Sequence, residues 1–334
     1  MERGSYMGAR DSIRLALLLL AIIGLSQSLN PPMISSFDEA EFRASSGTII
    51  AEELNWKLVE SVPKDSLSFT QGLEIHDGLL YESGGLYGHS SLRIFSLGSG
   101  TPLETVNLSS DLFGEGLTIY GDEIIVLTWK SGRVLRYSFD LAQVNESVIF
   151  GEGWGICSTN NQLVTSDGSS RLTFRDPVDL VKVSNIEVTL NGESLDQINE
   201  LECLGDKIYA NRWYDNRIFE IDMNTGIVNS VLDFTSLVDD QGSDAYGHVL
   251  NGIAFDPSSG DFWITGKNWT HFHRVSIIDE NQDVSSFNGR FLIAFLVSST
   301  LLLPLFGSVF FNNREPKGIQ AAPHVGRNGG APHG

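Results

Sequence analysis

The stretch FTQGLEIHDGLLYESGG, residues 69–85, indicates the fold because its pattern returns four more times along the chain. Each copy has a polar or aromatic residue, a small residue (Glu in the fourth copy), an apolar residue, a turn and a short apolar strand. The apolar positions align at Leu73, Leu117, Ile156, Leu201 and Ile253, which are 44, 39, 45 and 52 residues apart. Strand-rich repeats of ~40–50 residues are typical of β-propeller blades.

Two further strands follow in most copies. A third strand is predicted in every repeat, because apolar and polar residues alternate there as in half-buried strands; these stretches are SLRIFSL, RVLRYSF, RLTFRDP, NRIFEID and HRVSIID. A fourth can be read in the first four repeats, as LETVNLS, VNESVIF, VSNIEVT and IVNSVLDF. The fifth repeat has no room for one before the apolar stretch that begins at Phe291.

The missing strand has a candidate near the other end of the chain. The stretch NWKLVESV, residues 55–62, precedes the first repeat and has no other partner. We expect it to join the last blade and close the ring, so that no sheet edge stays open there. Helical periodicity is absent from this region. The sequence therefore predicts an all-β, five-bladed β-propeller over residues 55–284.

Two apolar stretches flank the propeller. Residues 15–25 follow three arginines and are short, as in an export signal, so residues 1–28 are predicted to be a signal peptide or signal anchor, with a linker over residues 29–54. Residues 291–311 carry no charge over about the ~20 residues that cross hydrocarbon. They predict a transmembrane helix over residues 290–312, the alternative being a buried core helix. Basic residues follow it, so residues 313–334 are expected to be a cytoplasmic tail and the propeller to lie on the extracytoplasmic side.

The charge distribution limits the partners. Of the chain's 22 Lys and Arg and 42 Asp and Glu, the body between Asn30 and Gly289 holds 15 and 39, so it is strongly acidic and should bind no nucleic acid. The lipid bilayer is an expected partner only through the C-terminal helix. Sequons begin at Asn107, Asn145 and Asn268 and suit an exported glycoprotein. The two cysteines could pair in an oxidising compartment, and no Cys/His cluster has zinc-ligand spacing.

Equivalent positions on the innermost strands converge on the central channel of a propeller. Two residues before each aligned apolar position the sequence has one carboxylate, three amides and an indole: Glu115, Gln71, Asn199, Asn251 and Trp154. Buried polar groups need partners or water, so a purely structural ring would favour small or apolar residues here. The ring is therefore a candidate binding site.

Tryptophans gather near the same mouth of the predicted channel. Trp129, Trp213 and Trp269 follow the second strands of their repeats, and Trp154 belongs to the ring itself. Packing between blades is the structural alternative for such residues. Together with Glu115 and Lys267, however, they indicate an apolar-walled pocket with a few convergent polar groups.

At these residues the chain resembles the glutaminyl cyclases of the plant and bacterial type, over nearly all of residues 69–269. The resemblance rests on ordered motifs: FTQGL (69–73), ESGGLYG (82–88), FGEGLT (113–118), LTW (127–129), GEGWG (151–155), SDGS (166–169), NELE (199–202), ANRW (210–213), LNG (250–252) and ITGKNW (264–269). It implies a five-bladed propeller that converts N-terminal glutamine of peptides to pyroglutamate and releases ammonia. It also implies a set of site residues, Phe69, Gln71, Glu115, Trp129, Trp154, Asn199, Trp213 and Lys267.

In this interpretation Glu115 is the general acid and base, and Lys267 pairs with it or stabilises an oxyanion. Gln71 and Asn199 hold the substrate amide, aromatic walls exclude water, and no metal or other cofactor is required. A structural role for Glu115, in an ion pair or a strand-end hydrogen bond, is the alternative.

Two other functions stay open on the sequence. One is a non-catalytic propeller that binds peptide or carbohydrate. The other is a calcium-dependent, lactonase-like propeller, for which Glu115, Asn199, Glu202 and Asn251 would supply oxygen ligands.

Overall fold

The computed structural model describes residues 48–65, 68–241 and 247–278. The chain divides into two compact units: residues 1–53 with 58–276, which hold the propeller, and residues 54–57 with 277–334, of which only 54–57, 277 and 278 are described. The predicted signal, tail and C-terminal helix lie outside the described residues. Within the described ranges, no helix has the length and apolarity needed to span a membrane.

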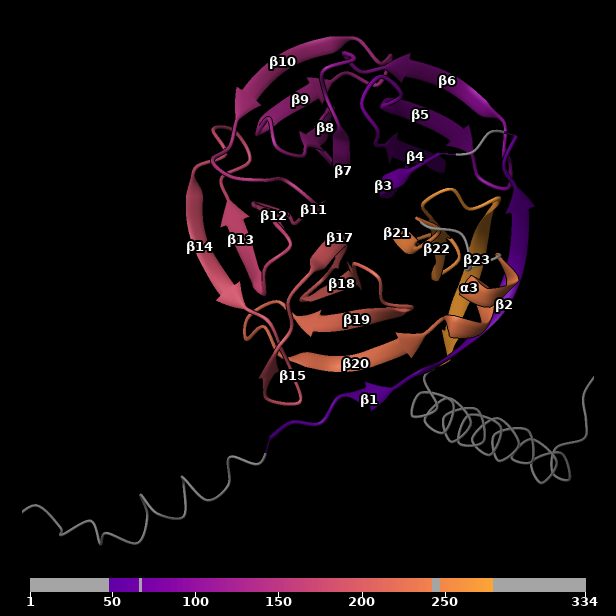
Figure 1. The fold of residues 1–334 in the computed structure, drawn as a ribbon, viewed down its shortest axis with the longest axis vertical. Coiled ribbons are helices and arrows are strands. Elements are labelled where there is room, and N and C mark those ends of the chain that lie inside the picture. Colours follow the sequence, from indigo (N-terminus) through magenta and orange to yellow (C-terminus); the bar gives the residue numbers. More distant parts are fainter. Residues whose placement is uncertain (1–47, 66–67, 242–246, 279–334) are drawn as a thin grey trace, which may run out of the picture. The chain divides into compact units, whose positions relative to one another are not determined.

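Five sheets form a ring, and the first strand of each sequence repeat lies innermost in its sheet (Figure 1). Blade 1 contains β3 (Thr70–His76), β4 (Leu79–Gly84), β5 (Ser91–Ser96) and β6 (Pro102–Asn107). Blade 2 contains β7 (Gly114–Tyr120), β8 (Glu123–Thr128), β9 (Arg133–Tyr137) and β10 (Gln143–Val148). Blade 3 contains β11 (Ile156–Ser158), β12 (Leu163–Thr165), β13 (Arg171–Arg175) and β14 (Lys182–Glu187).

Blade 4 contains β17 (Ile198–Leu204), β18 (Lys207–Arg212), β19 (Arg217–Asp222) and β20 (Val228–Asp233). Blade 5 contains β21 (Leu250–Asp256), β22 (Asp261–Gly266) and β23 (His271–Ile278), and its outermost strand is β2 (Asn55–Pro63). The predicted five-bladed propeller is therefore confirmed. So is the closure of the ring by the stretch at residues 55–62, which pairs with β23 as the sequence predicted.

Apolar side chains of neighbouring blades pack together and hold the ring. Between blades 1 and 2, for example, Leu92 and Ile94 belong to the same buried cluster as Leu117, Ile124 and Val126. Comparable clusters join blades 2 and 3, blades 3 and 4, and blades 5 and 1. Because each sheet buries both faces against its neighbours, its inner strands are rigidly supported around the channel.

Cys157 and Cys203 form a disulfide with 5.4 Å between their Cα atoms. The bond joins β11 of blade 3 to β17 of blade 4. Both strands lie innermost, so the bond links two blades next to the channel.

Three elements were not predicted. The expected linker over residues 29–54 ends in β1 (Glu52–Glu53), which adds a parallel fifth strand to blade 4 by pairing with β20. A hairpin of β15 (Thr189–Leu190) and β16 (Glu193–Ser194) connects blades 3 and 4. A six-residue helix, α3 (Thr235–Asp240), follows β20 and accounts for part of the long fourth repeat.

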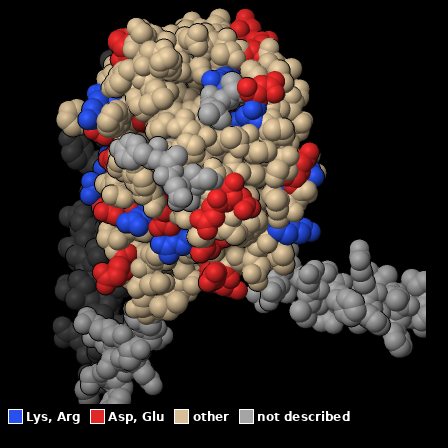
Figure 2. All heavy atoms as spheres, turned by 45° about the vertical axis from the view of Figure 1, so that its right-hand side comes forward, with Lys and Arg blue, Asp and Glu red and all other residues tan. Residues whose placement is uncertain are grey.

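The surface carries charges of both signs. On the face drawn in Figure 2, basic and acidic side chains are interspersed between larger uncharged areas. The sequons at Asn107 and Asn145 lie at exposed positions of the outermost strands β6 and β10. Asn268 is half-buried beside Lys267. Their glycosylation stays a prediction.

Candidate active site

All eight site residues inferred from the sequence line one cavity of about 230 Å³. They come from all five blades, and the cavity also includes Phe113, which was not among the residues inferred from the sequence. Phe113 occupies the position in the second repeat that Phe69 occupies in the first, so the repeat alignment itself could have identified it. The functions of these residues stay predictions.

β-Bulges direct the polar ring residues into the channel. The strand register shifts around Gln71, Glu115, Asn199 and Asn251, between residues 70 and 72, 114 and 117, 198 and 201, and 250 and 253. A bulge interrupts the ladder and turns a side chain away from its regular direction. A register shift therefore occurs at the ring position in four of the five blades.

Glycines that follow the ring positions allow the inner strands to approach. A Cβ at Gly72 would lie 2.3 Å from the backbone nitrogen of Leu117, and one at Gly155 would lie 2.0 Å from the carbonyl oxygen of Asn199. The fourth repeat has Glu200 instead of a small residue. Its buried carboxylate accepts hydrogen bonds from the backbone N–H groups of Leu73 (3.2 Å) and Ile253 (2.9 Å), which ties blade 4 to blades 1 and 5.

Glu115 and Lys267 are the buried charged groups of the cavity, with 5% and 4% of their surface exposed. Burial raises the pKa of Glu115 well above its usual range, opposed by the positive charge of Lys267 and reinforced by the negative charge of Glu152. Burial likewise lowers the pKa of Lys267 to about 8, and Glu115 opposes this shift. Burial therefore favours the protonated form of Glu115, whereas Lys267 favours its carboxylate.

Lys267 does not form a direct ion pair with Glu115 among the ion pairs of the described residues. Its ammonium group lies 5.0 Å from the centre of the Phe69 ring, a cation–π arrangement. The backbones of Phe69 and Lys267 form an isolated antiparallel bridge between blades 1 and 5. This bridge fixes the position at which the Lys267 side chain enters the cavity.

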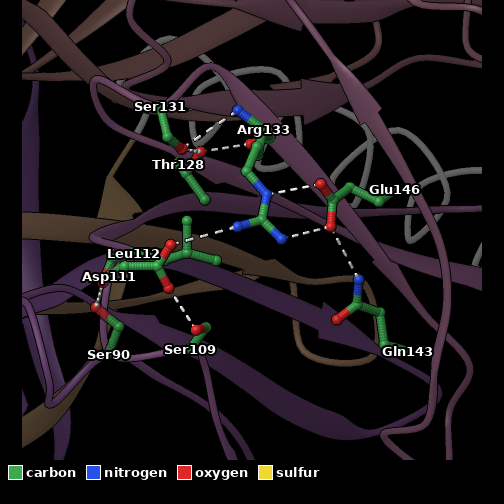
Figure 3. Close-up of polar contacts among 9 residues, drawn as sticks. All are labelled: Ser90, Ser109, Asp111, Leu112, Thr128, Ser131, Arg133, Gln143 and Glu146. Carbon is green, nitrogen blue, oxygen red and sulfur yellow. Dashed lines mark hydrogen bonds and ion pairs between the residues drawn. The ribbon is translucent and has the colours of Figure 1, made fainter.

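The segment that leads to Phe113 and Glu115 is held from outside the cavity (Figure 3). The Ser90 hydroxyl accepts from the N–H of Gly114 (3.0 Å), and its single proton is shared between the carbonyl oxygens of Leu86 (2.9 Å) and Leu112 (3.2 Å), so it contacts the backbone on both sides of Phe113. The carboxylate of Asp111, the residue before Leu112, lies 3.7 Å from the guanidinium group of Arg133. Arg133 also forms a bidentate pair with Glu146 of β10. This network anchors the segment to blade 2.

Asn251 and Asn199 are the two other amide side chains of the polar ring. Asn251 donates to the carbonyl oxygen of Thr70 (3.0 Å) and to the amide oxygen of Gln71 (3.5 Å), so it supports Gln71 without lining the cavity. Asn199 is buried, and its amide oxygen has no hydrogen-bond partner in the described structure. A buried amide oxygen without a partner is costly, and a donor on a bound ligand would satisfy it.

Aromatic rings form most of the wall. Phe69, Phe113 and Trp129 follow one another through edge contacts of 6.1 and 5.4 Å between ring centres. Trp154 and Trp213 continue the wall with a T-shaped contact of 5.7 Å. The expectation that Trp269 belongs to this group is wrong. It is fully buried against Gly266 and His273, because the turn after β22 directs the indole into blade 5.

The ligand set considered for calcium is not brought together. Glu115 and Asn199 line the cavity, whereas Glu202 lies farther along β17. Burial raises the pKa of Glu202, and the negative charges of Glu74 and Glu200 raise it further. In the described part of the chain, no group of three or more His, Cys, Asp or Glu residues is arranged to hold a metal ion. Whether the reaction is independent of metal stays a prediction.

Comparison with known proteins identifies the family. The sequence pattern of the family described as glutamine cyclotransferase matches residues 33–277. Glutaminyl-peptide cyclotransferase of Arabidopsis thaliana is 31% identical over 231 residues, which cover 66% of this chain and 71% of that protein. The crystal structure of Myxococcus xanthus glutaminyl cyclase superimposes with a TM-score of 0.64 at 35% identity, covering 69% of this chain and all of that one. The chain therefore belongs to the glutamine cyclotransferase family of enzymes.

Proposed function

We propose that this protein converts N-terminal glutamine of peptides and proteins to pyroglutamate, with Glu115 as the general acid and base. The observation that carries the proposal is the buried Glu115 carboxyl group, whose pKa is raised, inside an aromatic cavity that also contains Lys267. Membership of the family and the names of the two relatives support the same reaction.

The reaction is intramolecular. The neutral α-amine attacks the Cδ atom of its own side-chain amide, and a new C–N bond closes the five-membered ring. Glu115 accepts the proton that the amine loses and donates it to the departing amide nitrogen. The old C–N bond then breaks and ammonia leaves. An enclosed cavity that holds the side chain curled toward the amine supplies much of the rate enhancement.

The other cavity residues have supporting roles. Lys267 stabilises the oxyanion of the tetrahedral intermediate in this proposal, which is supported by the position of its ammonium group 5.0 Å from the centre of the Phe69 ring. The partnerless amide oxygen of Asn199 accepts a hydrogen bond from the substrate amide or amine. The tryptophans pack against the methylene groups of glutamine and keep bulk water from the reacting atoms.

The test is ammonia release from a Gln-initiated peptide, with the loss of the corresponding mass from the peptide. Glu115→Gln keeps the size of the side chain but cannot carry the proton. Its turnover should fall by ~10²-fold or more while peptide binding persists. Trp154→Ala should instead weaken both binding and turnover, because it removes part of the cavity wall.

Circular dichroism and thermal unfolding of each variant provide the control, since a misfolded blade would also abolish activity. Folded Glu115→Gln with undiminished ammonia release would remove Glu115 from the mechanism. Wild-type protein that binds such peptides without releasing ammonia would support the alternative function of a non-catalytic binding propeller.

The chain's apolar residues 291–311 support a location as well: an anchor in the membrane with the propeller on the extracytoplasmic side. A chain ending near Asp283 should then be soluble and active. On intact cells, external protease should leave the tail after Arg314 uncut, and trimming of that tail with an intact propeller would refute this orientation.

A further inference from the structure

Glu152 contacts two walls of the cavity without lining it. It lies half-buried in the segment that precedes β11. A single oxygen of its carboxylate, Oε2, accepts hydrogen bonds from the indole N–H of Trp129 (2.7 Å) and from that of Trp154 (3.0 Å). Trp129 follows β8 of blade 2 and Trp154 precedes β11 of blade 3, so the carboxylate joins two blades at the site.

This contact completes an arc of side chains around the cavity. On one side of Glu152 the arc runs through Trp129 and Phe113 to Phe69, and on the other it runs through Trp154 to Trp213. Each indole has one hydrogen-bond donor, and Glu152 satisfies both donors. The polar edges of the two rings are thereby held by one anion. The arrangement restrains two large side chains, of which Trp129 is also covered by the ammonium group of Lys130, 4.1 Å from its ring centre.

The backbone of the same region is held independently. Trp129 N–H donates to the carbonyl oxygen of Phe113 (3.0 Å), and Gly153 N–H donates to the carbonyl oxygen of Trp129 (3.3 Å). Removal of the Glu152 carboxylate should therefore release the indoles without unfolding the segment.

We propose that Glu152 is a positioning residue, which fixes Trp129 and Trp154 as one wall of the substrate cavity. The proposal rests on the cyclase function proposed above. Burial is the largest influence on the pKa of Glu115 and raises it. Of the charged groups that act on Glu115, Lys267 lowers this pKa and Glu152 raises it. Two separate properties of Glu152 are thus involved, a hydrogen-bond acceptor and a charge.

Two substitutions separate these properties. Glu152→Gln keeps an acceptor oxygen for the indoles but removes the charge. Glu152→Leu removes both. Glu104→Gln is the matched control, because it removes the same charge from an exposed position of the outer strand β6.

The first readout is the pair of indole N–H resonances of Trp129 and Trp154 in the NMR spectrum, assigned by substitution. Glu152→Leu should shift both and raise KM for a Gln-initiated peptide roughly tenfold, with a smaller change in kcat. Glu152→Gln should leave the resonances nearer their wild-type positions. It should also move the acidic limb of the kcat/KM profile to lower pH by roughly 0.5 unit or more, since Glu115 loses a neighbouring negative charge. The same peptide is used for every variant, so the titration of its α-amine contributes equally to each pH profile.

Unchanged indole resonances in Glu152→Leu would overturn the positioning role, and an unshifted profile in Glu152→Gln would overturn the electrostatic role. Should Glu152→Leu fail to fold, Glu152→Ala removes the same acceptor with a smaller side chain, and indole resonances in it like those of Glu104→Gln would contradict the positioning role. The NMR readout does not depend on turnover. If Glu152 holds both indoles in a wild-type protein that releases no ammonia, the cyclase function is refuted and the positioning of the two indoles still stands.

Discussion

The disulfide between Cys157 and Cys203 offers a quantitative test of how the ring is held. Replacing both cysteines with alanine removes a bond between residues 46 apart in sequence. For a loop of that length, the loss of chain entropy in the unfolded state corresponds to about 4 kcal/mol at 25 °C. For a domain of this size, that loss should lower Tm by roughly 8–16 °C.

The assay is urea unfolding followed by tryptophan fluorescence, for the wild type, the double variant and the wild type in reducing agent. Cys157 is buried, so its replacement by alanine also removes packing contacts. The reduced wild type keeps every atom of both side chains and isolates the contribution of the bond.

An effect on activity should accompany the loss of stability. The bond joins β11, which begins two residues after Trp154, to β17, which carries Asn199. Reduction should therefore raise KM more than it lowers kcat. A double variant and a reduced wild type that both unfold within about 1 kcal/mol of the oxidised protein would refute the entropic argument, because loop closure alone predicts several times that value.

Three further predictions concern the channel and the reaction. Exhaustive chelation should leave ammonia release unchanged, and a loss that Zn²⁺ or Ca²⁺ restores would contradict a metal-free mechanism. Burial raises the pKa of Glu74 from 4.5 to about 7, so the stability that its neutral form supplies is complete below pH 4.5 and is lost as pH rises through 7. Relative to wild type, the free energy of unfolding of Glu74→Gln in urea should therefore be roughly 1–3 kcal/mol higher at pH 8 than at pH 5. The same pH dependence in both proteins would argue against this. Glu200→Gln should cost about 1–3 kcal/mol, because an amide has a single acceptor for the N–H groups of Leu73 and Ile253; unaltered exchange protection of those two amides would contradict it.

Much of the site could be predicted because a propeller repeats. Once five copies of one pattern are aligned, equivalent residues must converge on a common axis, so Gln71, Glu115, Trp154 and Asn199 could be grouped without coordinates. The closing strand at residues 55–62 followed from the same counting, since the fifth repeat lacks a fourth strand. Phe113 could have been added by completing the alignment with Phe69.

The unpredicted elements lie where the repeat provides no template. The strand β1 is two exposed residues long and has no alternation to read. The hairpin of β15 and β16 did have a local signal, because Asn191 and Gly192 adopt the left-handed conformations that a tight hairpin turn requires. The helix α3 is too short for a periodic pattern.

The number of blades, the closure of the ring and the ring of polar residues could all be inferred from the sequence, because all three follow from periodicity along the chain. The partners across blades became known only from the folded structure. It placed the carboxylate of Glu152 between two indoles, directed Glu200 across the channel to two backbone amides, and buried Trp269 in blade 5. The physical reason is that a repeat specifies which residues reach the axis, whereas the hydrogen bonds and packing that each one finds there depend on non-equivalent side chains supplied by neighbouring blades.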